Sequence, residues 1–187
     1  ARRVLSLRSL DLGGYILKAG SPSCGMARVK RYGAKGAPRR DATGVFAAAL
    51  LEAFPHLPVE DEGRLNDPRL RENFIERVFA YRRLVELFRG RWTRGRVVAF
   101  HTEHKLQLMA HSMAAYRALG RLVAEMKALP RPAFRAQYTE GFMGALTRIA
   151  TRGRNANVLQ HAAGSLKQCL DPASRGELAT LIHDYRA

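Results

Sequence analysis

The sequence predicts a mixed fold, in which a partial α/β segment over residues 1–93 precedes an all-α domain of about five helices over residues 94–187. Three observations support this division. Short apolar runs bounded by turn residues fill the first part, and periodic apolar patterns with helix-capping residues fill the second. Between them, the stretch from Gly90 to Gly95 interrupts the helical pattern. With 187 residues, of which 47% are hydrophobic, the chain can bury one or two cores.

The first part is expected to alternate short strands with helices. The strands are predicted over residues 15–17, 29–32 and 59–62, and the helices over residues 44–54 and 68–88. Glycines and a proline make residues 33–38 a turn, and Asp41 or Thr43 is a candidate cap for the first helix. The second helix begins where Asp67, a capping residue, precedes Pro68 at the first helical position.

The second part is expected to consist of helices joined by short turns. They are predicted over residues 96–110, 113–129, 133–150, 155–170 and 172–185. Ser112 and Asp171 are capping residues at two of the starts, and Pro130 ends the helix that precedes it. Few clusters of β-branched residues occur here, which favours a compact helical domain over a sheet.

Basic residues dominate the chain, which carries a formal net charge of +16 at pH 7. Arginine supplies 26 of the 32 basic residues, a bias that either a GC-rich genome or a polyanionic partner can produce. Residues 91–154 hold twelve basic residues against three glutamates, so a nucleic acid would bind there. The alternative is a solvated basic surface without a ligand.

Nothing in the sequence indicates a membrane partner. No apolar run approaches the roughly 20 residues that span a bilayer, and no signal-peptide pattern opens the chain. Two widely separated cysteines do not make a disulfide framework, so we expect a reducing, cytoplasmic setting. The chain begins at Ala1 and ends at Ala187, and we expect the natural protein to extend beyond both ends.

The most specific local feature is the pentapeptide SPSCG at residues 21–25, which follows an apolar run. Its proline fixes φ, its glycine permits close backbone approach, and the hydroxyls of Ser21 and Ser23 can donate hydrogen bonds to a thiolate. A cysteine presented in this way suits a metal ligand, or a nucleophile if nearby cations lower the pKa of its thiol. The alternative is that Cys24 is a buried, inert thiol in a turn. The other cysteine, Cys169, lies in a predicted helix.

A second group of candidates lies on the predicted helices of the basic half. Spacings of three and seven place His101, His104 and His111 on one helical face, as a candidate ligand or metal face. The outer pair is roughly 15 Å apart along the helix axis, so one metal ion cannot bind all three. His161 on another helix is then the candidate additional ligand, and Asn157 belongs to the same polar stripe. The alternatives are histidines that form hydrogen bonds in the interior or that flank a polyanion groove.

Three consecutive carboxylates, Glu60, Asp61 and Glu62, stand at the end of a predicted strand. Paired carboxylates can transfer protons or bind a cation, and the end of a strand in an α/β unit is a favourable place for a site. Glu60 and Glu62 are the candidates for that chemistry. The alternative is a solvated loop whose carboxylates pair with Arg64 and Arg69.

Several of these motifs together resemble a known pair of domains. The second half of the TudS-like desulfurase domain, whose family includes thiouracil desulfurases, resembles this chain at residues 16–18 (ILK), 21–25 (SPSCG) and 58–74 (PVEDEGRLNDPRLRENF). The YbgA-type helical domain of unknown function, which is often fused behind it, resembles the chain at residues 100–105 (FHTEHK), 110–112 (AHS) and 155–161 (NANVLQH). Departures from the usual family pattern occur at Ala19, Gly20 and Ser165.

The resemblance implies a function as well as a fold. TudS-like enzymes are similar to one another in holding a [4Fe-4S] cluster on three cysteines, with one iron open to sulfur from a thiolated base. Cys24 matches the last of these cysteines, with Ser21 and Ser23 as neighbouring hydrogen-bond donors, and the first two would precede this chain. The resemblance thus implies a sulfur-removing enzyme for thiolated nucleobases or similar small thio-compounds. The chain alone is expected to hold no cluster and to be inactive.

Two other functions stay open at this point. The chain is a nucleic-acid-binding accessory protein if the basic residues of 91–154 carry its function. It is a purely structural helical partner if the second part binds no ligand, and the two parts would then unfold as one unit.

Overall fold

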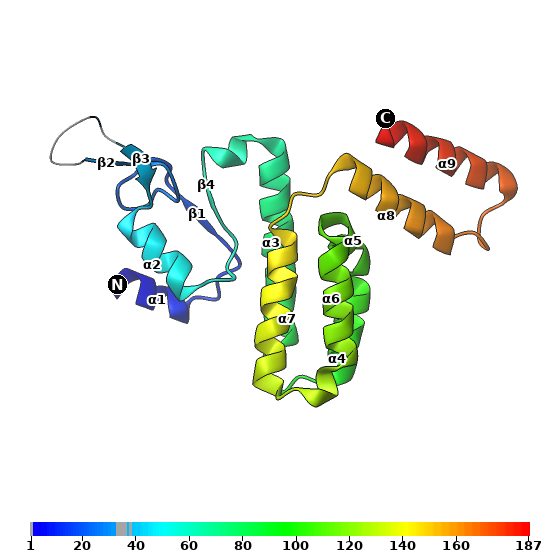
Figure 1. Ribbon diagram of the computed structural model, residues 1–187, viewed down its shortest axis with the longest axis horizontal. Helices are drawn as coiled ribbons and strands as arrows, with labels where there is room; N and C mark the ends of the chain where they lie inside the picture. Colours follow the sequence, from blue (N-terminus) through cyan, green and yellow to red (C-terminus); the bar gives the residue numbers. More distant parts are fainter. Residues whose placement is uncertain (1, 33–36, 38) are drawn as a thin grey trace. The chain divides into compact units, whose positions relative to one another are not determined.

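The computed structural model describes residues 2–32, 37 and 39–187, which form two compact units (Figure 1). The first unit is Ala1–Glu86 and the second is Leu87–Ala187. The first unit contains short strands and helices, and the described elements of the second are helical, so the predicted order of a mixed segment and a helical part is confirmed. The domain boundary between residues 93 and 94 stays a prediction.

The first unit contains two short strand pairs (Figure 1). Its elements are α1 (Arg2–Ser6), η1 (Leu7–Ser9), β1 (Tyr15–Leu17), β2 (Val29–Arg31), β3 (Arg39–Ala42), α2 (Val45–Ala53), β4 (Val59–Asp61), η2 (Arg64–Asn66) and α3 (Pro68–Leu87). β1 and β4 are parallel, with Tyr15 opposite Val59, whereas β2 and β3 are antiparallel. Parallel strands need a crossover connection, and α2 lies within it.

The structure differs from the prediction just before α2. Residues 39–42 form strand β3 against β2, which the sequence analysis missed. The helix starts after Gly44 and no side chain caps it, so the predicted caps at Asp41 and Thr43 are wrong. Asp41 instead pairs with Arg31 across the hairpin, at 3.1 Å between carboxylate and guanidinium. The turn predicted over residues 33–38 lies outside the described residues, except for Ala37.

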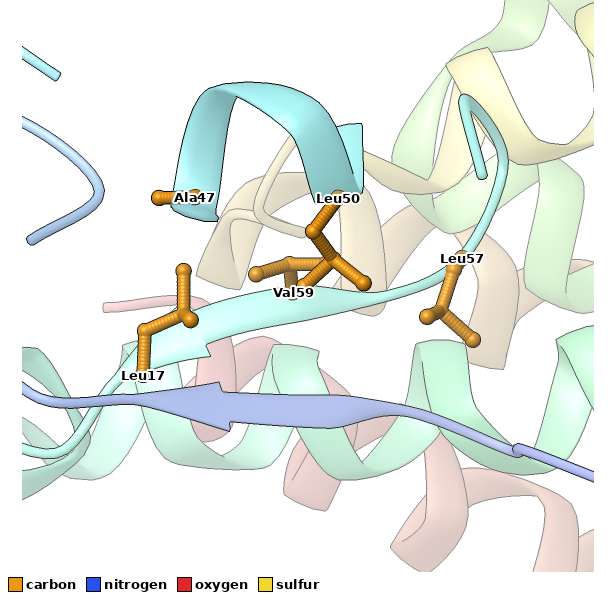
Figure 2. Packing of buried hydrophobic residues seen from close by; sticks show 5 residues of the cluster. All are labelled: Leu17, Ala47, Leu50, Leu57 and Val59. Atoms are coloured by element: carbon orange, nitrogen blue, oxygen red, sulfur yellow. The ribbon is translucent and has the colours of Figure 1, made fainter. Parts of the chain in front are cut away.

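The core of the first unit lies between α2 and one face of the parallel strand pair (Figure 2). Its buried members, each at most 5% exposed, are Leu17, Ala47, Leu50, Leu57 and Val59. Side chains alternate along a strand, so every second residue of β1 and β4 can face the helix. Cys24 is among the partly buried residues that pack against this cluster. The core therefore extends to the loop that carries the thiol.

α3 is held against the segment that leads into β1. A Cβ atom on Gly14 would lie 2.6 Å from Cγ2 of Val78, so only glycine permits this close approach. Nearby, Nη2 of Arg82 donates a hydrogen bond to Oδ2 of Asp11 at 2.6 Å. These contacts between distant parts of the sequence place α3 next to the strand pair.

The second unit consists of helices. These are α4 (Arg94–Glu103), α5 (Lys105–His111), α6 (Met113–Ala124), η3 (Met126–Ala128), α7 (Arg131–Leu146), α8 (Arg152–Ser165) and α9 (Pro172–Arg186). Among the described residues, side chains cap the starts of four of them, α4, α6, α8 and α9. Ser112 and Asp171 accept backbone N–H bonds at the starts of α6 and α9, as predicted. The single helix predicted over residues 96–110 is divided at His104, whose backbone leaves the helical region. In the described ranges, no helix has the length and apolar character to cross a bilayer.

α7 supplies the centre of the second unit. Phe134, Tyr138 and Phe142 recur every four residues, are fully buried, and stack their rings along one helix face. Trp92 packs against Phe134 with ring centroids 5.7 Å apart, and Phe100 packs against Phe142 at 5.1 Å. This aromatic column fixes α4 against α7 and determines where His101 of α4 lies.

Candidate functional site

Cys24 lies in a turn that follows the carboxyl end of β1. Within this turn, Oγ of Ser21 accepts hydrogen bonds from the backbone N–H groups of Ser23 at 3.3 Å and Cys24 at 3.2 Å. The N–H of Gly25 donates to the carbonyl of Ser21 at 2.8 Å. Ser21 thus organises the backbone around a half-buried free thiol, as serine commonly does in turns. We call residues 21–25 the cysteine turn.

The cysteine turn also caps α2. The first amide groups of a helix have no acceptor within the helix. Here the N–H of Val45 donates to the carbonyl of Pro22 at 3.3 Å. Phe46 and Ala47 both donate to the carbonyl of Ser23, at 2.9 and 3.2 Å. Because backbone carbonyls of the turn satisfy these donors, α2 needs no side-chain cap.

Glu60 and Asp61, at the end of β4, are buried and both bind Arg64. Oε1 of Glu60 accepts a hydrogen bond from Nε of Arg64 at 2.7 Å. Oδ1 of Asp61 accepts the backbone N–H of Arg64 at 2.9 Å, a bond that aspartate commonly forms in turns. Arg64 is thus a partner that the pairing alternative predicted, but the solvated loop of that alternative is wrong, because Glu60 and Asp61 are buried in β4. The other predicted partner, Arg69, donates its backbone N–H to Asp67 instead.

Glu62 connects the ends of the two parallel strands. Its Oε2 accepts the backbone N–H of Ala19 at 2.7 Å, and Nζ of Lys18 lies 3.1 Å from its Oε1. The N–H of Ala19 holds the pKa of the Glu62 carboxyl below its ordinary value, and Lys18 adds to this effect. Since Ala19 begins the connection from β1 to the cysteine turn, Glu62 restrains the start of that connection.

Arg77 of α3 was not among the site residues predicted from the sequence. Its Nε is buried, and no hydrogen-bond partner for it occurs among the described residues. Burial lowers the pKa of the Arg77 guanidinium, and the negative charge of Glu60 opposes this shift. Glu60 is therefore influenced by two arginines, one in direct contact and one through space. The available signal was the spacing of three from the buried Phe74, which places Arg77 on the packed side of its helix.

His101 of α4 lies between two tyrosines. Its Nδ1 is 3.1 Å from Oη of Tyr138, within hydrogen-bond distance, and its ring stacks on that of Tyr116 with centroids 5.6 Å apart. Burial lowers the pKa of the His101 imidazole, and the nearby His104 lowers it further. His101 is thus held largely neutral at physiological pH within a polar and aromatic pocket of side chains.

His104 and His111 form hydrogen bonds inside the second unit. Nδ1 of His104 donates to the carbonyl of Phe100 at 2.8 Å, within the same helical segment. Nδ1 of His111 donates to the carbonyl of Arg148, which ties α5 to the end of α7. Both side chains are at most 4% exposed. These contacts agree with the alternative in which the histidines bond in the interior.

His161 and Asn157 lie exposed on α8. Across residues 2–32, 37 and 39–187, no three side chains of the His, Cys, Asp and Glu types are grouped as metal ligands. The structure therefore does not bring His101, His104 and His161 together into the metal site that the spacing suggested. The polar stripe on α8 stays a prediction.

The cysteine content does not fit a complete iron–sulfur cluster. The chain has two cysteines, Cys24 in the first unit and Cys169 in the second, and both are free thiols. A [4Fe-4S] cluster is held by three or four ligands, normally thiolates. Cys24 can supply one of them, so one copy of residues 1–187 does not contain the full ligand set.

Comparison with known proteins finds two families that match different parts of the chain. Residues 1–62 match the family described as 2-thiouracil desulfurase, and residues 105–187 match a family of proteins of unknown function, DUF1722. The chain is 32% identical over 123 residues to the uncharacterized protein YbgA of Escherichia coli strain K12, an alignment that covers 65% of this chain and 73% of YbgA. No solved structure matches the chain. The chain therefore belongs to the YbgA family, with a 2-thiouracil desulfurase-type region ahead of a DUF1722 domain.

Proposed function

We propose that this chain is part of a sulfur-removing enzyme that acts on thiolated nucleobases or similar small thio-compounds, with the helical half as an accessory domain. The observation that carries the proposal is the placement of Cys24. It lies within the region that matches the 2-thiouracil desulfurase family, in a turn beyond the carboxyl end of a parallel strand. Ligands of α/β proteins bind at this edge of the sheet.

The proposal requires thiolates from outside residues 1–187. Cys24 would supply one ligand of a [4Fe-4S] cluster, and another segment or a partner chain would supply the others. The residues of this chain hold that one ligand in place. Ser21 orders the cysteine turn, and the first N–H groups of α2 donate hydrogen bonds to carbonyls of the turn. Glu62 restrains the start of the connection that leads into the turn. The free thiols also support a reducing, cytoplasmic setting as part of the same proposal.

An anaerobic iron and sulfide assay with an absorbance spectrum tests the proposal on the protein from the complete open reading frame. We expect about four irons per chain. Cys24→Ala should lose most of that iron, whereas the matched control Cys169→Ala should keep it, because Cys169 is exposed in the second unit. Sulfide release from 2-thiouracil should follow the iron content. Absence of iron from the wild-type protein, or equal iron in both variants, would contradict the proposal.

A second candidate function is binding of nucleic acid. All twelve basic side chains of residues 91–154 are exposed. In the first unit, Lys30 lies opposite Arg40 and Arg31 opposite Arg39 across the β2–β3 pair. Like charges directly opposite each other destabilise a hairpin, and a bound phosphate backbone would relieve that repulsion. These two basic surfaces favour a polyanionic partner.

Titration of the full chain with labelled RNA and DNA at about 50 and about 200 mM salt tests this candidate. Replacing the exposed Arg148 and Arg152 by glutamine should weaken binding and reduce its salt dependence. The control replaces Arg175 and Arg186 on α9, outside residues 91–154, and should change binding less. No binding at the lower salt, together with unfolding of both units in one transition, would favour the purely structural role instead.

A further inference from the structure

We infer that Gly44 is a positioning residue for the Cys24 thiol, because it alone allows the start of α2 to contact the peptide bond that precedes the cysteine. The inference rests on the proposed function, which gives Cys24 its role as a ligand. It concerns how this chain holds the thiol, and that is measurable without any cluster.

The backbone of Gly44 lies directly against the cysteine turn. A Cβ atom on this buried residue would lie 2.3 Å from the carbonyl oxygen of Ser23 and 2.8 Å from the nitrogen of Cys24. Packed interiors leave no room for such an overlap, so alanine must displace the Ser23–Cys24 peptide. Gly44 itself has φ of −63° and ψ of 145°, which any residue can adopt. Glycine is therefore required here because a Cβ atom does not fit against the Ser23–Cys24 peptide, and not because of the backbone conformation.

Hydrogen bonds on both sides of this contact keep the Ser23–Cys24 peptide from moving away readily. The N–H of Gly44 donates to the carbonyl of Gly25 at 2.8 Å, just beyond the cysteine. The carbonyl of Ser23, just before the cysteine, accepts from both Phe46 and Ala47. Cys24 is thus flanked by two carbonyls that are bound to the first turn of α2. Moving the peptide away from a new Cβ would lengthen or break these bonds.

The direction of the Cys24 side chain follows from the plane of the peptide before it. A displaced Ser23–Cys24 peptide therefore turns the Cα–Cβ bond and moves the thiol. Cys24 is half-buried and packs against the core beneath α2, so displacement should expose its sulfur. We expect exposure to raise its reactivity toward a small alkylating reagent.

Alkylation of the native chain of residues 1–187 by iodoacetamide measures this effect in a Cys169→Ser background, where Cys24 is the one cysteine left in these residues. Gly44→Ala should raise the alkylation rate by about tenfold, the factor expected when one or two hydrogen bonds that hold a local structure are lost. The matched control is Ala48→Gly, at an exposed position of the same helix. It weakens α2 through helix propensity and should leave the rate within about twofold of the parent.

Amide hydrogen exchange supplies a readout that general destabilisation does not reproduce. In Gly44→Ala, exchange should accelerate at the amides of Cys24, Phe46 and Ala47 relative to the rest of the first unit. In Ala48→Gly, exchange should accelerate along α2, including Phe46 and Ala47, but not at the amide of Cys24, and alkylation should not become faster. A folded Gly44→Ala chain with unchanged alkylation would overturn the inference.

A second variant keeps the inference testable if Gly44→Ala does not fold. Val45→Pro removes the N–H that donates to Pro22, and proline is tolerated at the first position of a helix. Val45 is 81% exposed, so no core packing is lost. Alkylation of Cys24 should again be faster than in the parent, and an unchanged rate would contradict the inference. Because alkylation needs neither iron nor substrate, a full-length protein without iron would refute the proposed function while leaving this result intact.

Discussion

Glu60 at the end of β4 and Arg64 in the following turn form an ion pair, with Oε1 of the carboxylate 2.7 Å from Nε of the guanidinium. The Glu60 side chain is 7% exposed and that of Arg64 is 50% exposed. Surface pairs contribute little to stability, but a buried carboxylate that loses its donor is costly. The pair therefore contributes to stability chiefly because, without Arg64, the buried carboxylate of Glu60 would lack a charged partner in direct contact.

Arg64→Ala should lower the free energy of unfolding by about 1–3 kcal/mol, because the buried carboxylate of Glu60 loses its charged donor and keeps only the backbone N–H of Asp61 as a direct hydrogen-bond partner among the described residues. Urea unfolding followed by circular dichroism measures the change. Arg69→Ala removes an exposed arginine from the same region and should change stability by less than about 0.5 kcal/mol. Equal stability of the two variants would mean that the backbone N–H of Asp61 and the nearby charge of Arg77 are enough to satisfy Glu60.

Stability should fall on mild acidification partly through His101. Burial lowers the pKa of its imidazole below 6.5, so the unfolded chain binds a proton at a higher pH than the folded chain does. The contribution is fully present above about pH 6.5 and is lost as the pH falls through the folded pKa. His101→Gln should therefore lose less stability between neutral and mildly acidic pH than the parent. Identical pH dependence in urea unfolding would argue against this assignment.

Leu50→Ala should destabilise the first unit by about 2–5 kcal/mol, since Leu50 is fully buried in the cluster of Figure 2 and its truncation leaves a cavity. Its neighbour Leu51, which is 37% exposed, provides the control. Leu51→Ala should cost less than about 1 kcal/mol by the same denaturation measurement. Equal losses of stability in the two variants would show that Leu50 does not pack in the core beneath α2 as Figure 2 shows.

Ser112→Ala should destabilise the second unit by about 0.5–2 kcal/mol, because Oγ of Ser112 accepts the N–H of Ala115 at the start of α6. Ser112→Thr keeps the hydroxyl and should recover most of the loss. Thermal unfolding of the three proteins makes the comparison. If threonine and alanine are equally destabilising, the cap does not determine the effect.

The helices of the second unit were predictable because their signals are local. Ser112 and Asp171 cap α6 and α9 as expected. Phe134, Tyr138 and Phe142 are spaced four residues apart, and this spacing is typical of a buried helix face. The division of the first predicted helix was not visible, because it depends on how His104 bonds to Phe100 once the helix is packed. Periodicity continues through such a break and does not reveal it.

The candidate site was predictable only in part. Residues 21–25 could be read as a turn that presents a thiol, since proline, serine and glycine favour turns through local interactions. The cap of α2 was predicted wrongly, because the acceptors lie more than twenty residues away in the cysteine turn. Arg77 was missed for the same reason: its burial depends on which face of α3 meets the strand pair.

The sequence by itself determined the order of a mixed segment and a helical part, the starts of α3, α6 and α9, and the turn that carries Cys24, because caps, periodicity and turn residues act over a few neighbouring residues. Only the tertiary structure decided that backbone carbonyls of the cysteine turn cap α2, that Gly44 must have no side chain, and that His104 and His111 bond in the interior while His161 lies exposed on α8. These outcomes depend on contacts between segments far apart in the chain. Burial and the need to satisfy each buried polar group select such contacts, and neither acts before the segments have packed.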